Sequence, residues 1–270
     1  MINYIHWDPS PTLFSWNLPI LGRPILWYGF LFALGFLLAY GVLLHLLRHE
    51  PDKEVKANSR KIADNITFYV VLGTIIGARL FDVLFYENWH KILRHPTSIF
   101  AVWEGGLASH GGVIGILVAL WLFQKRHRFC SWRHLVDLLV APAALVAFFI
   151  RLGNFINQEI LGKPTDVPWA VVFGHPADGS FPVPRHPVQL YEALYYLGLF
   201  FLLWLFKKSY KNWKEGKLAG VFLVAVFTFR FFIEFLKEEQ SVWWTDFPLT
   251  MGQLLSIPIV LLGIYLIRKK

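Results

Sequence analysis

The feature that most limits what this chain can fold into is its series of long apolar runs. Residues 25–47, for example, read ILWYGFLFALGFLLAYGVLLHLL, without Asp, Glu, Lys or Arg. Runs of roughly 18 apolar residues or more are long enough to cross a bilayer as a helix. The composition agrees, because only 16% of the residues are charged, against about 25% in a soluble protein. We therefore predict an all-α polytopic membrane protein.

Hydropathy predicts seven transmembrane helices within a single membrane domain, residues 1–270. The expected spans are 25–47, 66–86, 107–123, 134–150, 187–206, 217–236 and 250–267. The longest connection, 151–186, is rich in proline and cannot be helical throughout. We expect it to form a small periplasmic head, with a short strand at 169–173. Glycines spaced four apart, Gly73 with Gly77 and Gly111 with Gly115, predict close helix packing.

The basic residues indicate the orientation. Of the 26 Lys and Arg residues, 17 lie in alternate flanks of the spans, at 48–65, 124–133, 207–217 and 268–270. By the positive-inside rule these flanks are cytoplasmic, so the N-terminus is outside and the C-terminus inside. The net charge of +8 is thus a topology signal and predicts no nucleic-acid partner. No cleavable signal peptide is visible, and we expect the first span to act as the targeting signal.

Several common chemistries have no support in the sequence. The one cysteine, Cys130, lies in a basic loop and has no recognisable base aimed at it. Neither an HExxH zinc motif nor a G-x-S-x-G elbow is present. No cluster of suitable ligands indicates a metal or an organic cofactor.

Ionisable residues inside spans cost roughly 2.5–3.5 kcal/mol each on insertion scales, so each needs a reason. The candidates are Arg79, Asp82, His110, Asp137, Glu192, Arg230 and Glu234. Arg79 and Asp82, three residues apart, can neutralise each other on one helix face. Asp137 and Glu192 lie near span ends, where a hydrated or a paired role is equally plausible.

Arg230 and Glu234 are four residues apart among phenylalanines, so their side chains should meet. They are either an ion pair that permits insertion or an arginine held ready for a lipid anion. His110 precedes two glycines at the start of the third span. It is either a hydrogen-bonded core residue or a functional group beside a close backbone approach.

A polar stretch, RLGNFINQEILG at 151–162, follows an apolar span directly. If it is helical, one stripe carries Arg151, Asn154, Gln158 and Gly162, with Glu159 beside it. Snorkelling at a span end explains the arginine, but not the amides and the carboxylate. Guanidinium and amide donors on one face suit a phosphate. The residues thus predict an anionic-lipid site with possible acid–base chemistry.

This stretch also resembles the signature of the bacterial prolipoprotein diacylglyceryl transferases, approximately R-x-G-N-F-x-N-x-E-x-x-G. The resemblance continues in order along nearly the whole chain. It includes WYG at 27–29, GARLFDVLFY at 77–86, GGLASHGG at 105–112, PRHPVQLYE at 184–192, FRFFIEF at 229–235 and MGQLLSIP at 251–258. The long signature with these companions is specific, whereas no single short piece would be.

The resemblance implies an inner-membrane enzyme of lipoprotein biosynthesis. It would transfer the sn-1,2-diacylglyceryl group of phosphatidylglycerol to the lipobox cysteine of preprolipoproteins, leaving a thioether and glycerol phosphate. By motif position the catalytic residues are Arg151, Arg230 and His110. The substrate-binding residues are Tyr28, Asn154, Glu159, Gly162 and Glu234. The sequence has Val226 where some members have a tyrosine, which puts the hydroxyl contact from that turn in question.

The resemblance and the chemistry together suggest roles for these residues. The two arginines would clamp the phosphate, with Glu234 orienting Arg230 and Glu159 orienting Arg151. Asn154 and Tyr28 would hold the headgroup, and His110 could be the general base. The rival interpretations are a transporter or flippase for an anionic lipid, and a scaffold whose charges are purely structural.

Overall fold

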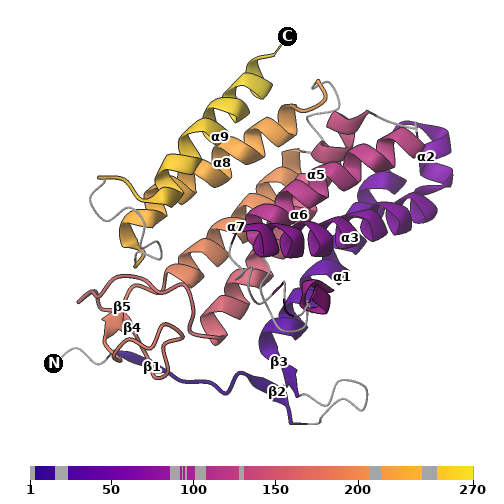
Figure 1. The fold of residues 1–270 in the computed structure, drawn as a ribbon. Helices are drawn as coiled ribbons and strands as arrows, with labels where there is room; N and C mark the ends of the chain where they lie inside the picture. The colour runs from indigo at the N-terminus through magenta and orange to yellow at the C-terminus, as the bar shows by residue number, and fades with distance from the viewer. Residues whose placement is uncertain are drawn as a thin grey trace. The chain divides into compact units, whose positions relative to one another are not determined.

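The structure, a computed structural model, describes residues 4–15, 24–85, 92, 94, 96–100, 108–127, 131–206, 214–238 and 248–269. Its contacts divide the chain into two compact units, which we describe separately. The first consists of Met1–Val42 with Leu139–Lys270, and the second is Leu43–Leu138. Helices α1 (Trp27–Arg48) and α6 (Trp132–Ile156), labelled in Figure 1, each contain residues of both units.

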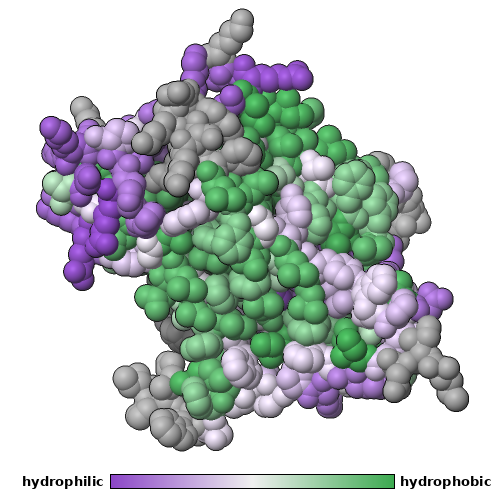
Figure 2. Space-filling model, turned by 180° about the vertical axis from the view of Figure 1, so that it is seen from behind, coloured by the Kyte–Doolittle hydropathy of each residue, from purple (hydrophilic) through white to green (hydrophobic). Residues whose placement is uncertain are grey.

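Long apolar helices dominate both units. Besides α1 and α6 they are α3 (Ser59–Phe85), α5 (Ser109–Arg126), α7 (Val188–Phe206), α8 (Lys217–Ile233) and α9 (Met251–Arg268). Six of the described helices are long and apolar enough to cross a membrane, namely all of these except α5, with α8 counted to Leu236. Large hydrophobic side chains such as Phe68, Leu194 and Leu205 lie exposed on them. Figure 2 shows apolar residues over much of one face. The chain is therefore an all-α polytopic membrane protein.

In the second unit, glycines allow α3 and α5 to touch backbone to backbone. A Cβ on Gly115 would meet the carbonyl oxygen of Gly73, and one on Gly111 would meet that of Gly77. The predicted close packing of these glycines is confirmed. The predicted pair Arg79–Asp82 is confirmed as well, with Nη1 and Oδ2 3.1 Å apart. The same unit contains α2 (Lys53–Ala57) and the 3-10 helix η1 (Pro96–Phe100).

In the first unit, α8 packs along α9, again through glycines. A Cβ on Gly220 would lie 2.7 Å from the carbonyl oxygen of Gly263. A 3-10 turn, η4 (Glu234–Leu236), continues α8. Helix α9 begins with a capping box, in which Thr250 and Gln253 satisfy each other's backbone N–H groups.

A small sheet forms where α6 leads towards α7. Strand β4 (Val171–Phe173) pairs in parallel with β1 (Ile5–Trp7) and antiparallel with β5 (Pro184–Arg185). The expected strand within 169–173 is thus present. Trp7 stacks on Phe155 at 4.6 Å between ring centroids and donates its indole N–H to the Phe155 carbonyl. The sheet is thereby fastened to the last turn of α6. Strands β2 (Thr12–Phe14) and β3 (Ile25–Leu26) form a separate antiparallel pair before α1.

Candidate active site

The signature RLGNFINQEILG is helical only at its start, because α6 ends at Ile156. Gln158 and Ile160 then take positive φ angles of 54° and 57°. Residues with a side chain rarely adopt this left-handed conformation. The expected single helical stripe is therefore wrong beyond Asn154, since Gln158 and Gly162 lie after the helix has ended.

Gln158 is held in its turn by residues far away in the sequence. Its Nε2 donates to Asp8 Oδ1 at 3.1 Å, and its Oε1 accepts from the His175 backbone N–H at 2.7 Å. The ring of His175 lies 2.6 Å from the same Asp8 oxygen. The hydrogen bonds from His175 and Gln158 hold the pKa of Asp8 below its ordinary value of 3.8. These contacts fix the chain direction just before Glu159.

Arg151, on the last helical turns of α6, is enclosed by polar groups. Its Nε lies 3.0 Å from Glu192 Oε2, and its Nη1 donates to Asn154 Oδ1 at 2.9 Å. The Tyr196 hydroxyl makes a further hydrogen bond with it. The Arg151 side chain is only 15% exposed, so its guanidinium needs such partners to offset its lost hydration. The arrangement fixes the direction of the Arg151 fork.

The side chain of Asn154, which contacts Arg151, also contacts Glu159 and Tyr28. Its Nδ2 donates to Glu159 Oε1 at 2.8 Å, and the Tyr28 hydroxyl is hydrogen bonded to its side chain. A Cβ on Gly153 would lie 2.7 Å from the Tyr28 ring, so glycine lets α1 bring this tyrosine close. We expected Glu159 to orient Arg151 directly. Instead it contacts Asn154, and Glu192 is the carboxylate that touches the arginine.

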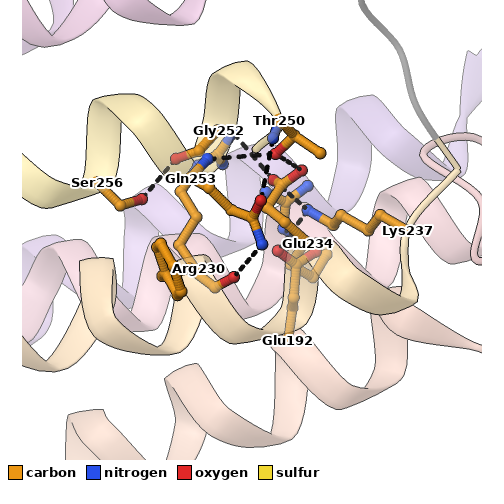
Figure 3. Close-up of polar contacts among 10 residues, drawn as sticks. Glu192, Arg230, Glu234, Lys237, Thr250, Gly252, Gln253 and Ser256 are labelled. Atoms are coloured by element: carbon orange, nitrogen blue, oxygen red, sulfur yellow. Dashed lines mark hydrogen bonds and ion pairs between the residues drawn. The ribbon is translucent and has the colours of Figure 1, made fainter. Parts of the chain in front are cut away.

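Arg230 and Glu234 meet at the end of α8, as their spacing predicted. Arg230 Nη2 and Glu234 Oε1 are 3.4 Å apart, and 34% of the arginine side chain remains exposed. The start of α9 supports this carboxylate from the other side (Figure 3). Thr250 Oγ1 lies 3.5 Å from Glu234 Oε2, and the carboxyl group rests against Gly252. Arg230 therefore has a fixed carboxylate partner and a side chain that stays partly exposed.

Lys237 joins the two arginine sites. Its ammonium is 2.8 Å from Glu192 Oε1 and 3.7 Å from Glu234 Oε1 (Figure 3). Glu192 is fully buried and Lys237 is 6% exposed. The carboxylate partners of Arg151 and Arg230 therefore share one buried ammonium group.

Gly162 contributes through its backbone. It pairs with Lys237 in an isolated β-bridge, and a Cβ there would meet the carbonyl oxygen of His186. Its own carbonyl accepts from Arg185 Nη1 at 3.1 Å, which also pairs with Glu238 at 2.8 Å. Close backbone packing therefore accounts for a glycine at position 162. The assignment of Gly162 to substrate binding stays a prediction.

His110 belongs to the second unit, where it lies exposed in the first turn of α5. The other seven predicted site residues lie in the first unit. Six of these form two contact groups, Tyr28, Arg151, Asn154 and Glu159 in one and Arg230 and Glu234 in the other, with Gly162 bridged to Lys237. Cys130 lies outside the residues that the structure describes.

Three residues of the network were not assigned to the site from the sequence. Glu192 closes the PRHPVQLYE segment, Lys237 follows Glu234 by three residues, and Tyr196 lies one turn beyond Glu192. The hydroxyl of Tyr196 is hydrogen bonded with Arg151. Val226, where some family members have a tyrosine, is buried. The hydroxyl of Tyr196 comes from α7.

Comparison with known proteins gives a consistent result. The family described as prolipoprotein diacylglyceryl transferase matches residues 16–268. A phosphatidylglycerol–prolipoprotein diacylglyceryl transferase of Tolumonas auensis is 43% identical, over 97% of this chain and 96% of its own length. Proteins of the same name from Chloroherpeton thalassium and Porphyromonas gingivalis are 43% and 44% identical, each over 98% of this chain and 94% of their own length. The chain therefore belongs to the prolipoprotein diacylglyceryl transferase family.

Proposed function

We propose that this chain transfers the diacylglyceryl group of phosphatidylglycerol to the lipobox cysteine of preprolipoproteins, the first step of lipoprotein maturation. Its relatives are named for this lipid and this protein substrate. A polytopic membrane protein has direct access to both substrates. The observation that carries the proposal is the buried charge network that connects Arg151 with Arg230.

The reaction needs positive charge where the leaving group forms. The cysteine sulfur bonds to the terminal glyceryl carbon, and the carbon–oxygen bond to the phosphate breaks. Glycerol phosphate departs with the bonding electrons, so negative charge grows on its oxygens. Preorganised guanidinium donors in a poorly hydrated site stabilise such charge. Arg151 and Arg230 provide these donors, and Glu234 fixes the position of Arg230. Asn154, Tyr28 and Glu159 hold the lipid headgroup.

The thiol proton goes to His110 in this scheme. The transfer from a thiol to a neutral imidazole is uphill, because a free thiol is a weaker acid than a free imidazolium. A nearby arginine lowers this cost because it stabilises the thiolate. The exposure of His110 at the start of α5 suits a group that meets an incoming substrate. Gly162 takes part by keeping the backbone compact beside Lys237.

The sheet supports a topology with seven membrane crossings. Residues 5–7 pair with 171–173, so both segments lie on one side of the membrane. An even number of crossings must then separate them. Of the described helices between them, α1, α3 and α6 are long and apolar enough to cross, and α5 supplies the fourth crossing. The two helices α7 and α8 likewise separate Gly162 from its bridge partner Lys237.

With α9, the chain crosses seven times as one membrane domain, with 151–186 as the head. The distribution of Lys and Arg supports an orientation with the N-terminus and the head in the periplasm and the C-terminus in the cytoplasm. The membrane is the bacterial inner membrane, where phosphatidylglycerol and an exported signal peptide meet.

The test is a reconstitution of purified protein with phosphatidylglycerol and a synthetic lipobox peptide, read by mass spectrometry. We expect the peptide to gain one diacylglyceryl group, and a peptide with serine in place of cysteine to gain none. A folded preparation that forms no adduct would overturn the proposal. Lipid moved between leaflets without an adduct would instead favour a flippase.

A further inference from the structure

Five side chains of the first unit alternate in charge along one path. Glu192 contacts Arg151 at 3.0 Å and Lys237 at 2.8 Å, one cation on each carboxylate oxygen. Lys237 lies 3.7 Å from Glu234, which lies 3.4 Å from Arg230. The path runs from arginine through carboxylate, ammonium and carboxylate to arginine. With three cations and two anions, it carries a net charge of +1.

The position of Lys237 in this path is fixed by the backbone. The Lys163 N–H donates to the Leu236 carbonyl at 2.8 Å, and the Glu238 N–H donates to the Leu161 carbonyl at 3.0 Å. These hydrogen bonds flank the bridge between Lys237 and Gly162. The segment that carries the lysine is therefore fastened to the end of the signature stretch.

The ammonium changes what the carboxylates do to the arginines. A carboxylate can accept two parallel hydrogen bonds from one guanidinium and so neutralise it. With Lys237 on Oε1, Glu192 offers Arg151 only its other oxygen. Lys237 likewise offsets part of the charge of Glu234. Each arginine is thus oriented by a carboxylate without being fully neutralised by it.

We propose that Lys237 is a positioning residue that keeps Arg151 and Arg230 available to one phosphate, by neutralising the carboxylates that orient them. This inference rests on the proposed function. Lys237 itself does not touch the phosphate in this arrangement, because its ammonium is directed to Glu192 and Glu234 and is buried. Without it, two arginines face two carboxylates, and the site has no excess positive charge for the lipid anion.

The experiment measures transfer to a lipobox peptide as the phosphatidylglycerol content of the vesicles is varied. For Lys237→Met, which keeps the length of the side chain but not its charge, we expect the KM for the lipid to rise about tenfold or more. The kcat should change less. The matched control is Lys163→Met, the same loss of charge at an exposed neighbour, with KM expected within twofold of wild type.

The double variant Glu192→Gln with Lys237→Met separates this role from a packing role. It removes one positive and one negative charge, so the path of charged side chains keeps its net charge of +1. Arg151 then has no carboxylate beside it that could neutralise it. We expect its KM to be well below that of Lys237→Met, but still above the wild-type value, because Arg151 has lost the carboxylate that orients it. A lost packing contact would not be restored by the second substitution. If the single variant does not fold, Lys237→Arg replaces it, because this substitution keeps a positive charge beside the same two carboxylates. Its KM should stay within about threefold of wild type, and a rise of about tenfold would overturn the inference.

A folded Lys237→Met with a KM within twofold of wild type would overturn the inference. So would a double variant whose KM is no lower than that of Lys237→Met. In both cases the wild type still forms the adduct, and the proposed function stands. Failure of the wild type to form any adduct is the separate result that overturns the function itself.

Discussion

The carboxylate of Glu234 lies against the backbone of Gly252, so close that a Cβ on residue 252 would come within 2.6 Å of the carboxyl carbon. The first turn of α9 thereby sets how far the partner of Arg230 can extend. A glycine in the MGQLLSIP segment is needed here for proximity rather than for a special backbone angle.

Gly252→Ala should therefore impair transfer more than folding. The atom in the way is the end of a flexible side chain, which can move at little cost to stability, but the movement takes the carboxylate away from Arg230. We expect kcat/KM to fall about tenfold, the loss of one charge-assisted contact. Gly198→Ala is the control, since its Cβ would meet nothing within 4 Å. Equal transfer rates in the two variants would show that the position of Glu234 is unimportant.

Arg230→Lys keeps the charge but removes the planar fork. An ammonium group cannot hold Glu234 and a phosphate with parallel donors as a guanidinium can. We expect kcat/KM to fall roughly 10- to 100-fold, the range for losing a hydrogen bond between charged groups. Initial rates of peptide lipidation give the value. Wild-type turnover in this variant would contradict the clamp.

His110→Asn should lose activity in a pH-dependent way. Near pH 7 the thiol, with a pKa of about 8.5, needs a base, whereas near pH 9 most of it is already ionised. We expect the defect in kcat/KM to be largest at about pH 6–7 and to shrink towards about pH 9. A defect that is constant across this range would remove His110 from proton transfer, and so would no defect at all.

Gly115→Ala should destabilise the second unit. The added methyl group would meet the carbonyl oxygen of Gly73, which is backbone and cannot move without separating α3 from α5. Overpacking of this kind costs about 1–3 kcal/mol. Thermal unfolding in detergent should show a lower Tm, while Gly112→Ala, whose nearest neighbour is the Thr74 methyl group at 3.6 Å, should unfold like wild type.

Local spacing was enough to predict the pairs within one helix. Arg79 with Asp82 and Arg230 with Glu234 follow from the geometry of a helical turn alone. The glycine contacts of α3 and α5 were also accessible, because small residues spaced four apart form one groove whatever the partner helix is.

The partners of Glu192 could not be predicted in this way. Its two cations come from α6 and from the end of η4, and only tertiary packing decides which of the buried charges meet. The end of α6 is a similar case. Gln158 has no sequence signal for a left-handed turn, because the groups that stabilise it, Asp8 and His175, are distant in sequence.

The parallel pairing of β1 with β4 also dictates an order of events during biosynthesis. Residues 5–7 leave the ribosome long before their partners at 171–173. The N-terminal strand therefore has no partner strand until α6 and the segment after it have been synthesised. Trp7 can stack on Phe155 once α6 has been made, because Phe155 lies in its last turn. A nascent chain halted before residue 171 would lack this closure, so the pairing of β1 with β4 forms late, after α1, α3, α5 and α6 have been made.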